Sequence, residues 1–254
     1  GRQQHRTAEI AGQVAEMIAA QRQVEVGVIE PLVRIGQAEL AGDASVQVIE
    51  APCIGQCHQA PAACVGQHQL PQASVAAVSD LLTRGETAPR VLTPSEPDHE
   101  YTQLRRLLGG ALSPEQVLAE LKASQLRGLG GAGFPSWRKW ETVRAQPGRK
   151  AMVVNIDEGE VGTFKDWQVL TTTPHQVLEG LLIAALTVGA EDVWLYLRDE
   201  YHDGRVILTQ AIEALQQHLP AWQHKYPGWT WPATPSMQPE PISWRYLLTF
   251  LSRA

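Results

Sequence analysis

The chain has 254 residues, enough for one large or two ordinary domains, and its 44% hydrophobic content can supply a core. The net charge of −6 excludes general nucleic-acid binding, which needs a surface rich in Lys and Arg. No apolar run reaches the roughly 18 residues of a membrane span, no signal peptide is recognisable, and three cysteines do not make a disulfide framework. We therefore expect a cytoplasmic protein with no direct membrane insertion. Because the chain starts at Gly1, beside a helical pattern, and ends at Ala254 after an apolar stretch, we expect a fragment or a processed chain.

Residues 1–85 have the pattern of a small α/β domain. A helical period of apolar residues predicts a helix over 7–20, two β-rich runs follow at 24–30 and 45–50, and a second helix is expected over 72–85. The stretch between them contains Cys53 and Cys57 in C-x3-C spacing, which the spacing alone explains as two structural thiols. Cys64 lies in an apolar run and is expected to pack as a small hydrophobic residue.

Residues 86–111 contain three prolines and many charges in "ETAPRVLTPSEPDHE", and are interpreted as a linker.

The region 112–219 then alternates helices and strands. Ser113 followed by Gln116 resembles a capping box and predicts a helix, two apolar strands are expected over 150–155 and 192–198, and helices over 175–188 and 203–219. Strand, helix and strand in this order predict a parallel βαβ unit, whose ligands bind beyond the carboxyl ends of the strands. Residues 220–254, rich in Trp and Pro, show no period and are assigned no structure.

The stretch "LRGLGGAGFP", residues 126–135, concentrates glycine in one place: Gly128, Gly130, Gly131 and Gly133. Such a loop can turn its N–H groups toward one ligand without a Cβ in the way. A helix expected after Phe134 and Pro135 would add its positive N-terminal end, and Arg138 and Lys139 add full charge. This set suits a phosphate, although the spacing matches neither standard nucleotide motif, and a flexible interdomain loop is the alternative.

Four polar side chains follow the first strand of the βαβ unit: Asn155, Asp157, Glu158 and Glu160. Carboxylates this close repel one another, so an ordered cluster needs hydroxyl, metal or cation partners. Sugar hydroxyls fit best beside a phosphate site. The alternative is a solvated acidic loop, and no histidine nearby in the sequence supports a metal.

Four blocks together carry a family resemblance: "LRGLGGAGFPSWRKW", "VNIDEGEVGTFKDW", "TPHQVLEGLLIAA" and "LYLRDEY". Over about 112–215 the chain resembles the NADH-binding flavoprotein subunit of respiratory complex I, a module also found in NAD-dependent formate dehydrogenases and bidirectional hydrogenases. The resemblance implies an FMN held by the glycine loop, Lys139, Asn155, Asp157 and Glu158. It also implies NADH stacked on the flavin near Phe134, with Glu160 on the nicotinamide side. Hydride would pass from NADH to the flavin, and electrons from there to iron–sulfur clusters.

The front segment "APCIGQCHQAPAACVG" resembles the later half of a thioredoxin-like 2Fe–2S domain. That resemblance makes Cys53 and Cys57 two of the four cluster ligands, the other two having preceded the first helix and been lost by truncation. The expected fold is thus a thioredoxin-like domain (1–85), a linker (86–111), a Rossmann-like FMN/NADH-binding domain incomplete at its C-terminus (112–219) and an unassigned tail (220–254).

The resemblance leaves several hosts open. We favour a soluble NAD-dependent formate dehydrogenase, with further iron–sulfur and catalytic subunits as partners. The alternatives are the equivalent subunit of a hydrogenase or of complex I and, as a different class, a non-catalytic assembly or electron-carrier piece that binds no flavin.

Overall fold

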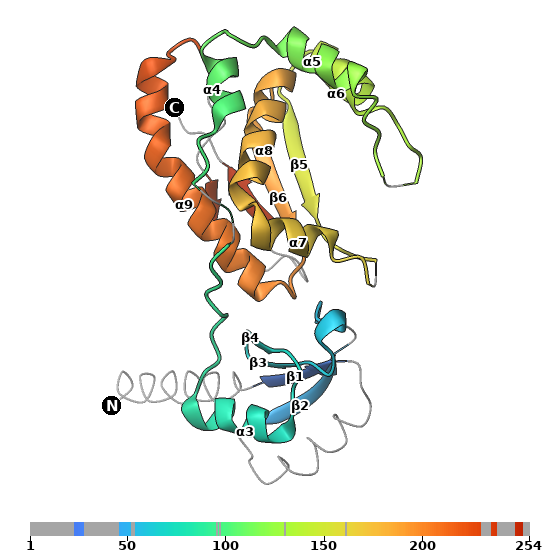
Figure 1. Cartoon of the computed structure of the whole chain (residues 1–254), viewed down its shortest axis with the longest axis vertical. Coiled ribbons are helices and arrows are strands. Elements are labelled where there is room, and N and C mark those ends of the chain that lie inside the picture. The colour runs from blue at the N-terminus through green and yellow to red at the C-terminus, as the bar shows by residue number, and fades with distance from the viewer. Residues whose placement is uncertain are drawn as a thin grey trace, which may run out of the picture. The chain divides into compact units, whose positions relative to one another are not determined.

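The computed structural model describes residues 23–27, 46–51, 54–94, 96, 98–129, 131–160, 162–229, 235–237 and 247–250. The chain divides into two compact units, unit 1 (1–91, 160–163 and 200–206) and unit 2 (92–159, 164–199 and 207–254). Both contain helices and strands, which confirms the α/β class (Figure 1). None of the helices in the described ranges is long and apolar enough to cross a membrane.

Unit 1 is built on a four-stranded sheet in the order β2-β1-β3-β4, in which β1 is parallel to β2 and the other pairs are antiparallel. The two expected β runs are confirmed as β1 and β2, whereas the helix expected over 7–20 lies outside the described residues. The elements are β1 (Gln23–Gly27), β2 (Gln47–Ala51), the short 3-10 helix η1 (Cys57–Gln59), β3 (Ala63–Val65), β4 (His68–Leu70) and α3 (Val75–Arg84).

Helix α3 closes the core of unit 1 and confirms the second expected helix. It begins because the hydroxyl of Ser74 accepts a hydrogen bond from the N–H of Ala77 at 3.2 Å, and it ends at Gly85, whose φ of +69° suits glycine. Its apolar face packs on β3 in a cluster of buried residues: Ala63, Val65, Ala73, Val78, Leu81 and Leu82. Cys64 of β3 is 1% exposed, which confirms that it packs as a small hydrophobic residue.

Unit 1 also takes in residues 200–206, which include the start of a later helix at His202. The buried side-chain amide of Gln69 donates to the carbonyls of Ile54 at 2.9 Å and of Glu200 at 2.6 Å. Gly55 has a φ of +73°, and a Cβ there would lie 2.5 Å from the ring of Tyr201. Only glycine fits at this position. The hydrogen bonds of Gln69 and the ring of Tyr201 therefore hold residues 200–201 against the segment between Cys53 and Cys57.

His202, which lies within residues 200–206, is expected to make the stability of the protein depend on pH. Burial, with a contribution from nearby Arg205, lowers the pKa of His202 to about 4. The folded protein therefore binds this proton less well than the unfolded chain, whose histidine titrates near 6.5, and stability is lost as the pH falls from about 6.5 to 4. The loss amounts to about 3 kcal/mol in all.

Urea unfolding at pH 7 and pH 4.5 measures this effect in wild type, His202→Gln and His224→Gln. His224 is exposed at the far end of the same helix. We expect the loss of unfolding free energy between pH 7 and pH 4.5 to shrink only in His202→Gln. An equal loss in all three proteins would contradict the assignment of this effect to His202.

Unit 2 contains the predicted βαβ unit. Strands β5 (Ala151–Ile156) and β6 (Asp192–Leu197) are parallel, with Ala151 opposite Asp192 and Ile156 opposite Leu197, which confirms the expected pairing. The sheet order is β5-β6-β8-β7. The further elements of unit 2 are α4 (Thr102–Leu108), α5 (Pro114–Ala123), α6 (Ser136–Ala145), α7 (Lys165–Thr172), α8 (Pro174–Val188), α9 (His202–Lys225, whose first turn belongs to unit 1), β7 (Pro235–Met237) and β8 (Leu247–Phe250).

The polar ends of helices α5 and α8 explain where these helices begin. Helix α5 has the expected capping box, in which the hydroxyl of Ser113 accepts from the N–H of Gln116 and the Gln116 side chain accepts from the N–H of Ser113. At α8 the cap comes from elsewhere, since the carboxylate of Glu96 accepts from the N–H groups of His175 and Gln176 at 2.7 and 3.0 Å. A carboxylate is stabilised there by the helix dipole.

The expected linker contains a helix, α4. Leu104 and Leu107 of α4 are completely buried, and Glu179 of α8 accepts from the N–H of Leu104 at 2.9 Å and contacts His99 at 2.8 Å. Burial raises the pKa of Tyr101. Its hydroxyl forms a hydrogen bond with Nδ1 of His175, 2.6 Å away.

Helix α9 continues to Lys225, beyond the expected end near residue 219, although it contains Pro220. Pro220 removes one backbone donor. The extension is held by Trp222, whose ring lies 5.4 Å from that of Tyr101 and stacks on His218 at 5.5 Å. Strands β7 and β8 likewise lie in the tail that the sequence pattern left without structure.

Candidate functional site

The two ends of the glycine loop (residues 126–135) are joined by backbone hydrogen bonds. The N–H of Gly128 donates to the carbonyl of Phe134, and that of Ser136 to the carbonyl of Leu126, both at 2.9 Å. Gly131 and Gly133 have φ values of +94° and +59°, and within the described part of the chain no further atom lies within 4 Å of the place where a Cβ would be. The backbone conformation at Gly131 and Gly133 thus favours glycine, and these two residues leave the surface of the loop open to a ligand. Gly130 lies outside the described residues.

Helix α6 begins directly after this loop, as expected, with Pro135 as its N-cap. Because proline has no side-chain oxygen, Pro135 leaves the first-turn N–H groups without a side-chain cap. Phe134 and Lys139 are exposed. Trp137, the bulkiest side chain of the first turn, lies under the amine of Lys122 from α5, 4.8 Å from its ring centroid.

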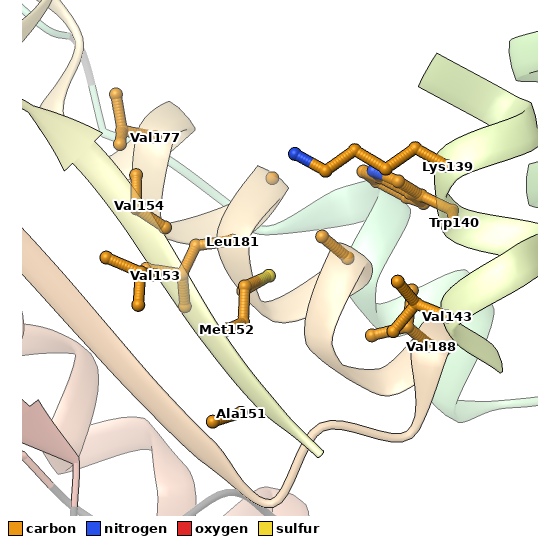
Figure 2. A pocket seen from close by; sticks show the side chains of 12 residues that line it. Lys139, Trp140, Val143, Ala151, Met152, Val153, Val154, Val177, Leu181 and Val188 are labelled. Carbon is orange, nitrogen blue, oxygen red and sulfur yellow. The ribbon is translucent and has the colours of Figure 1, made fainter. Parts of the chain in front are cut away.

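A cavity of about 400 Å³ lies between α6, β5 and α8, and almost all of its lining is apolar. Figure 2 shows the side chain of Lys139 reaching out from α6, with its amine pointing away from that helix toward β5 and α8. The lining includes Lys139, Trp140, Met152, Val154, Leu181 and Val188. The helix that follows the glycine loop and the strand that precedes the acidic turn therefore border one cavity.

The acidic turn (residues 155–160) begins in the last two residues of β5. The side-chain oxygen of Asn155 accepts from the N–H of Asp157 at 2.8 Å, and the N–H of Gly159 donates to the carbonyl of Asp157 at 3.0 Å. Asp157 is half-buried and Glu160 is exposed. These bonds fix the turn at the carboxyl end of the strand, where the βαβ pattern places ligands.

Glu158 has a role that its sequence position did not predict. Its side chain is 1% exposed, and its carboxylate accepts from the N–H groups of Asp166 at 3.0 Å and Trp167 at 3.1 Å, at the start of α7. The carboxylate thus caps a helix. A contact of Glu158 with a cofactor stays a prediction, as do the roles of the other residues assigned from the sequence.

The two cysteines expected to hold a cluster are not brought together by the described structure. Cys53 lies outside the described residues, and for Cys57 only the backbone, at the start of η1, is described.

Comparisons with known proteins place this site in context. Residues 121–228 match the Nuo51 FMN-binding domain. This range contains the glycine loop, the acidic turn and every lining residue of the cavity.

Two curated relatives extend the comparison. The chain is 38% identical over 136 residues to an NADH-quinone oxidoreductase subunit of Aquifex aeolicus, covering 53% of this chain and 32% of the relative. It is 31% identical over 214 residues to the alpha subunit of the NAD-reducing hydrogenase HoxS of Cupriavidus necator, covering 73% and 35%. The chain therefore spans about a third of the length of these relatives.

Among solved structures, the chain resembles an NAD+-reducing NiFe-hydrogenase crystallised in the H2-reduced state. The TM-score is 0.63 at 27% identity, and the match covers 80% of this chain and 42% of the other.

Proposed function

We propose that the chain binds FMN and exchanges hydride between NADH and the flavin, because residues 121–228 match the Nuo51 FMN-binding domain and the relatives are named as NADH-quinone oxidoreductase and NADH dehydrogenase flavoprotein subunits. The observation that carries this proposal is that the matched range contains both ligand-suited loops and the cavity between the elements that bear them. Within a larger oxidoreductase, the chain would then be the NADH-oxidising module.

The residues of the glycine loop fit the phosphate end of FMN. Gly131 and Gly133 leave room beside the backbone, and Lys139 offers an exposed ammonium group one turn into α6. Phosphate at such a loop is favoured by backbone N–H groups and by the helix N-terminus. Asn155 and Asp157 would accept hydrogen bonds from the ribityl hydroxyls.

Bound FMN supplies the hydride-accepting chemistry, and the protein supplies position and charge. Phe134, half-exposed at the end of the glycine loop, would offer an aromatic face to NADH. Glu160, exposed at the end of the acidic turn, would accept hydrogen bonds on the nicotinamide side.

The relatives favour an NADH-quinone oxidoreductase or a hydrogenase as host over the formate dehydrogenase expected from the sequence. We propose such a complex, in which other iron–sulfur and catalytic subunits accept the electrons. The setting we propose is cytoplasmic.

For the front unit we propose a thioredoxin-like 2Fe–2S domain with Cys53 and Cys57 as two of the four ligands. The hydrogenase match covers 80% of this chain and therefore extends into unit 1, because unit 2 alone is too short to supply that share. Because two further ligands are needed, iron content of the full-length protein, compared with its Cys53→Ser/Cys57→Ser variant, tests the assignment.

Titration of the purified chain with FMN tests the main proposal. We expect saturable quenching of flavin fluorescence with one FMN per chain, and NADH-dependent reduction of a dye by the complex. Glu160→Ala should keep its FMN while dye reduction falls about tenfold through a higher KM for NADH, a factor worth about 1.4 kcal/mol. A wild-type chain that binds no FMN would instead support the non-catalytic alternative.

A further inference from the structure

The residue that follows β6 reaches across to the acidic turn. Arg198 comes directly after Leu197, the residue paired with Ile156 at the end of β5. Its backbone N–H donates to the carbonyl of Ile156 at 3.4 Å, and Nη1 of its guanidinium donates to the carbonyl of Glu158 at 2.8 Å. A cation from the neighbouring strand thus holds the backbone of the turn.

Glu158 is consequently fixed from two sides. Arg198 holds its carbonyl, while the N–H groups of Asp166 and Trp167 hold its carboxylate. Hydrogen bonds to a charged group are stronger than neutral ones. These hydrogen bonds therefore restrict the backbone conformation of its neighbours in the chain, Asp157 and Gly159.

We propose that Arg198 is a positioning residue that fixes the acidic turn, so that Asp157 presents its carboxylate to FMN in one orientation. This inference rests on the proposed function for its ligand and on the two Arg198 hydrogen bonds for its geometry. Arg198 acts through the backbone of Glu158 and makes no contact with FMN. A turn held in its binding shape before the ligand arrives loses less conformational entropy on binding.

The chain offers a matched control at the other end of the same sheet. Arg149 makes two hydrogen bonds to the carboxylate of Asp192, the first residue of β6, at 2.7 and 2.8 Å. Arg149→Met and Arg198→Met each remove one guanidinium from one end of β6. Only Arg198→Met is expected to loosen the acidic turn.

The experiment measures FMN affinity by fluorescence quenching and thermal stability in both variants. We expect Arg198→Met to raise the Kd for FMN about tenfold and Arg149→Met to leave it within about twofold of wild type. Arg198→Lys should recover most of the affinity, because an ammonium group can donate the one side-chain hydrogen bond to the Glu158 carbonyl. Both methionine variants should melt below wild type. An unchanged Kd in Arg198→Met, or an equal loss in Arg149→Met, would overturn the proposal.

Amide hydrogen exchange separates this inference from the proposed function. Arg198→Met should speed exchange of the Gly159 N–H, which donates to Asp157, about tenfold in protein without FMN, whereas Arg149→Met should not. If the wild type binds no FMN, the proposed function fails, and this exchange result alone decides whether Arg198 holds the turn. Unchanged exchange would refute that role.

Discussion

Replacing Arg90 by methionine is expected to lower the free energy of unfolding by about 3–5 kcal/mol, the range for breaking a buried ion pair. The carboxylate of Asp203 is completely buried and is held by the Arg90 guanidinium at 2.7 and 2.8 Å and by the Arg90 N–H at 2.8 Å. Methionine keeps the length of the side chain and the backbone bond, but leaves the carboxylate without its cation. Urea unfolding followed by tryptophan fluorescence and circular dichroism measures the loss.

Two further variants locate the origin of this effect. Asp203→Asn should cost less, because the guanidinium it leaves behind is 26% exposed and can be hydrated. Arg84→Met, which removes an ion pair to Asp80 whose partners are 51% and 63% exposed, should cost under about 1 kcal/mol. Equal losses in Arg90→Met and Arg84→Met would show that burial of Asp203 does not govern the effect.

Replacing Lys139 by methionine should weaken FMN binding by about 10–100-fold, since a hydrogen bond to a charged group contributes about 1.5–3 kcal/mol. Among the described residues that line the cavity between α6, β5 and α8, Lys139 is the one cationic side chain. Methionine retains its apolar stem, so the change isolates the ammonium group. Flavin fluorescence quenching at low and moderate salt gives the Kd, and the difference between wild type and variant should shrink as salt screens the phosphate.

Arg138→Met is the matched control for this variant. Arg138 is the preceding residue on α6, equally cationic and exposed, and is absent from the cavity lining. We expect its Kd to stay within about threefold of wild type. A similar loss in both variants would indicate general attraction to a basic helix, and no loss in Lys139→Met would remove Lys139 from the site.

The elements of the candidate site that could be predicted are those with local causes. The capping box at Ser113 depends on residues three apart, and a helix after Pro135 on the fixed φ of proline at a helix start. Parallel pairing of β5 and β6 follows from two apolar strands separated by a helical crossover. Each of these signals lies within a few residues or one supersecondary unit.

The features that sequence reasoning missed depend on residues far apart in the chain. Glu96 caps α8 from 79 residues away, and α4 is stabilised by Glu179 at a separation of 75. The three-residue spacing of Leu104 and Leu107 fits a helix, but the prolines just before them favoured a linker. No sequence motif indicates that the carboxylate of Glu158 caps α7.

Residues 200–206, which include the first turn of α9, are needed in any attempt to produce unit 1 by itself. A polypeptide that stops at residue 91 would lack the Asp203 carboxylate that neutralises Arg90 and the Tyr201 ring that faces Gly55. Dissection by simple truncation should yield an insoluble or protease-sensitive product, whereas grafting residues 200–206 onto that piece through a flexible tether should rescue it.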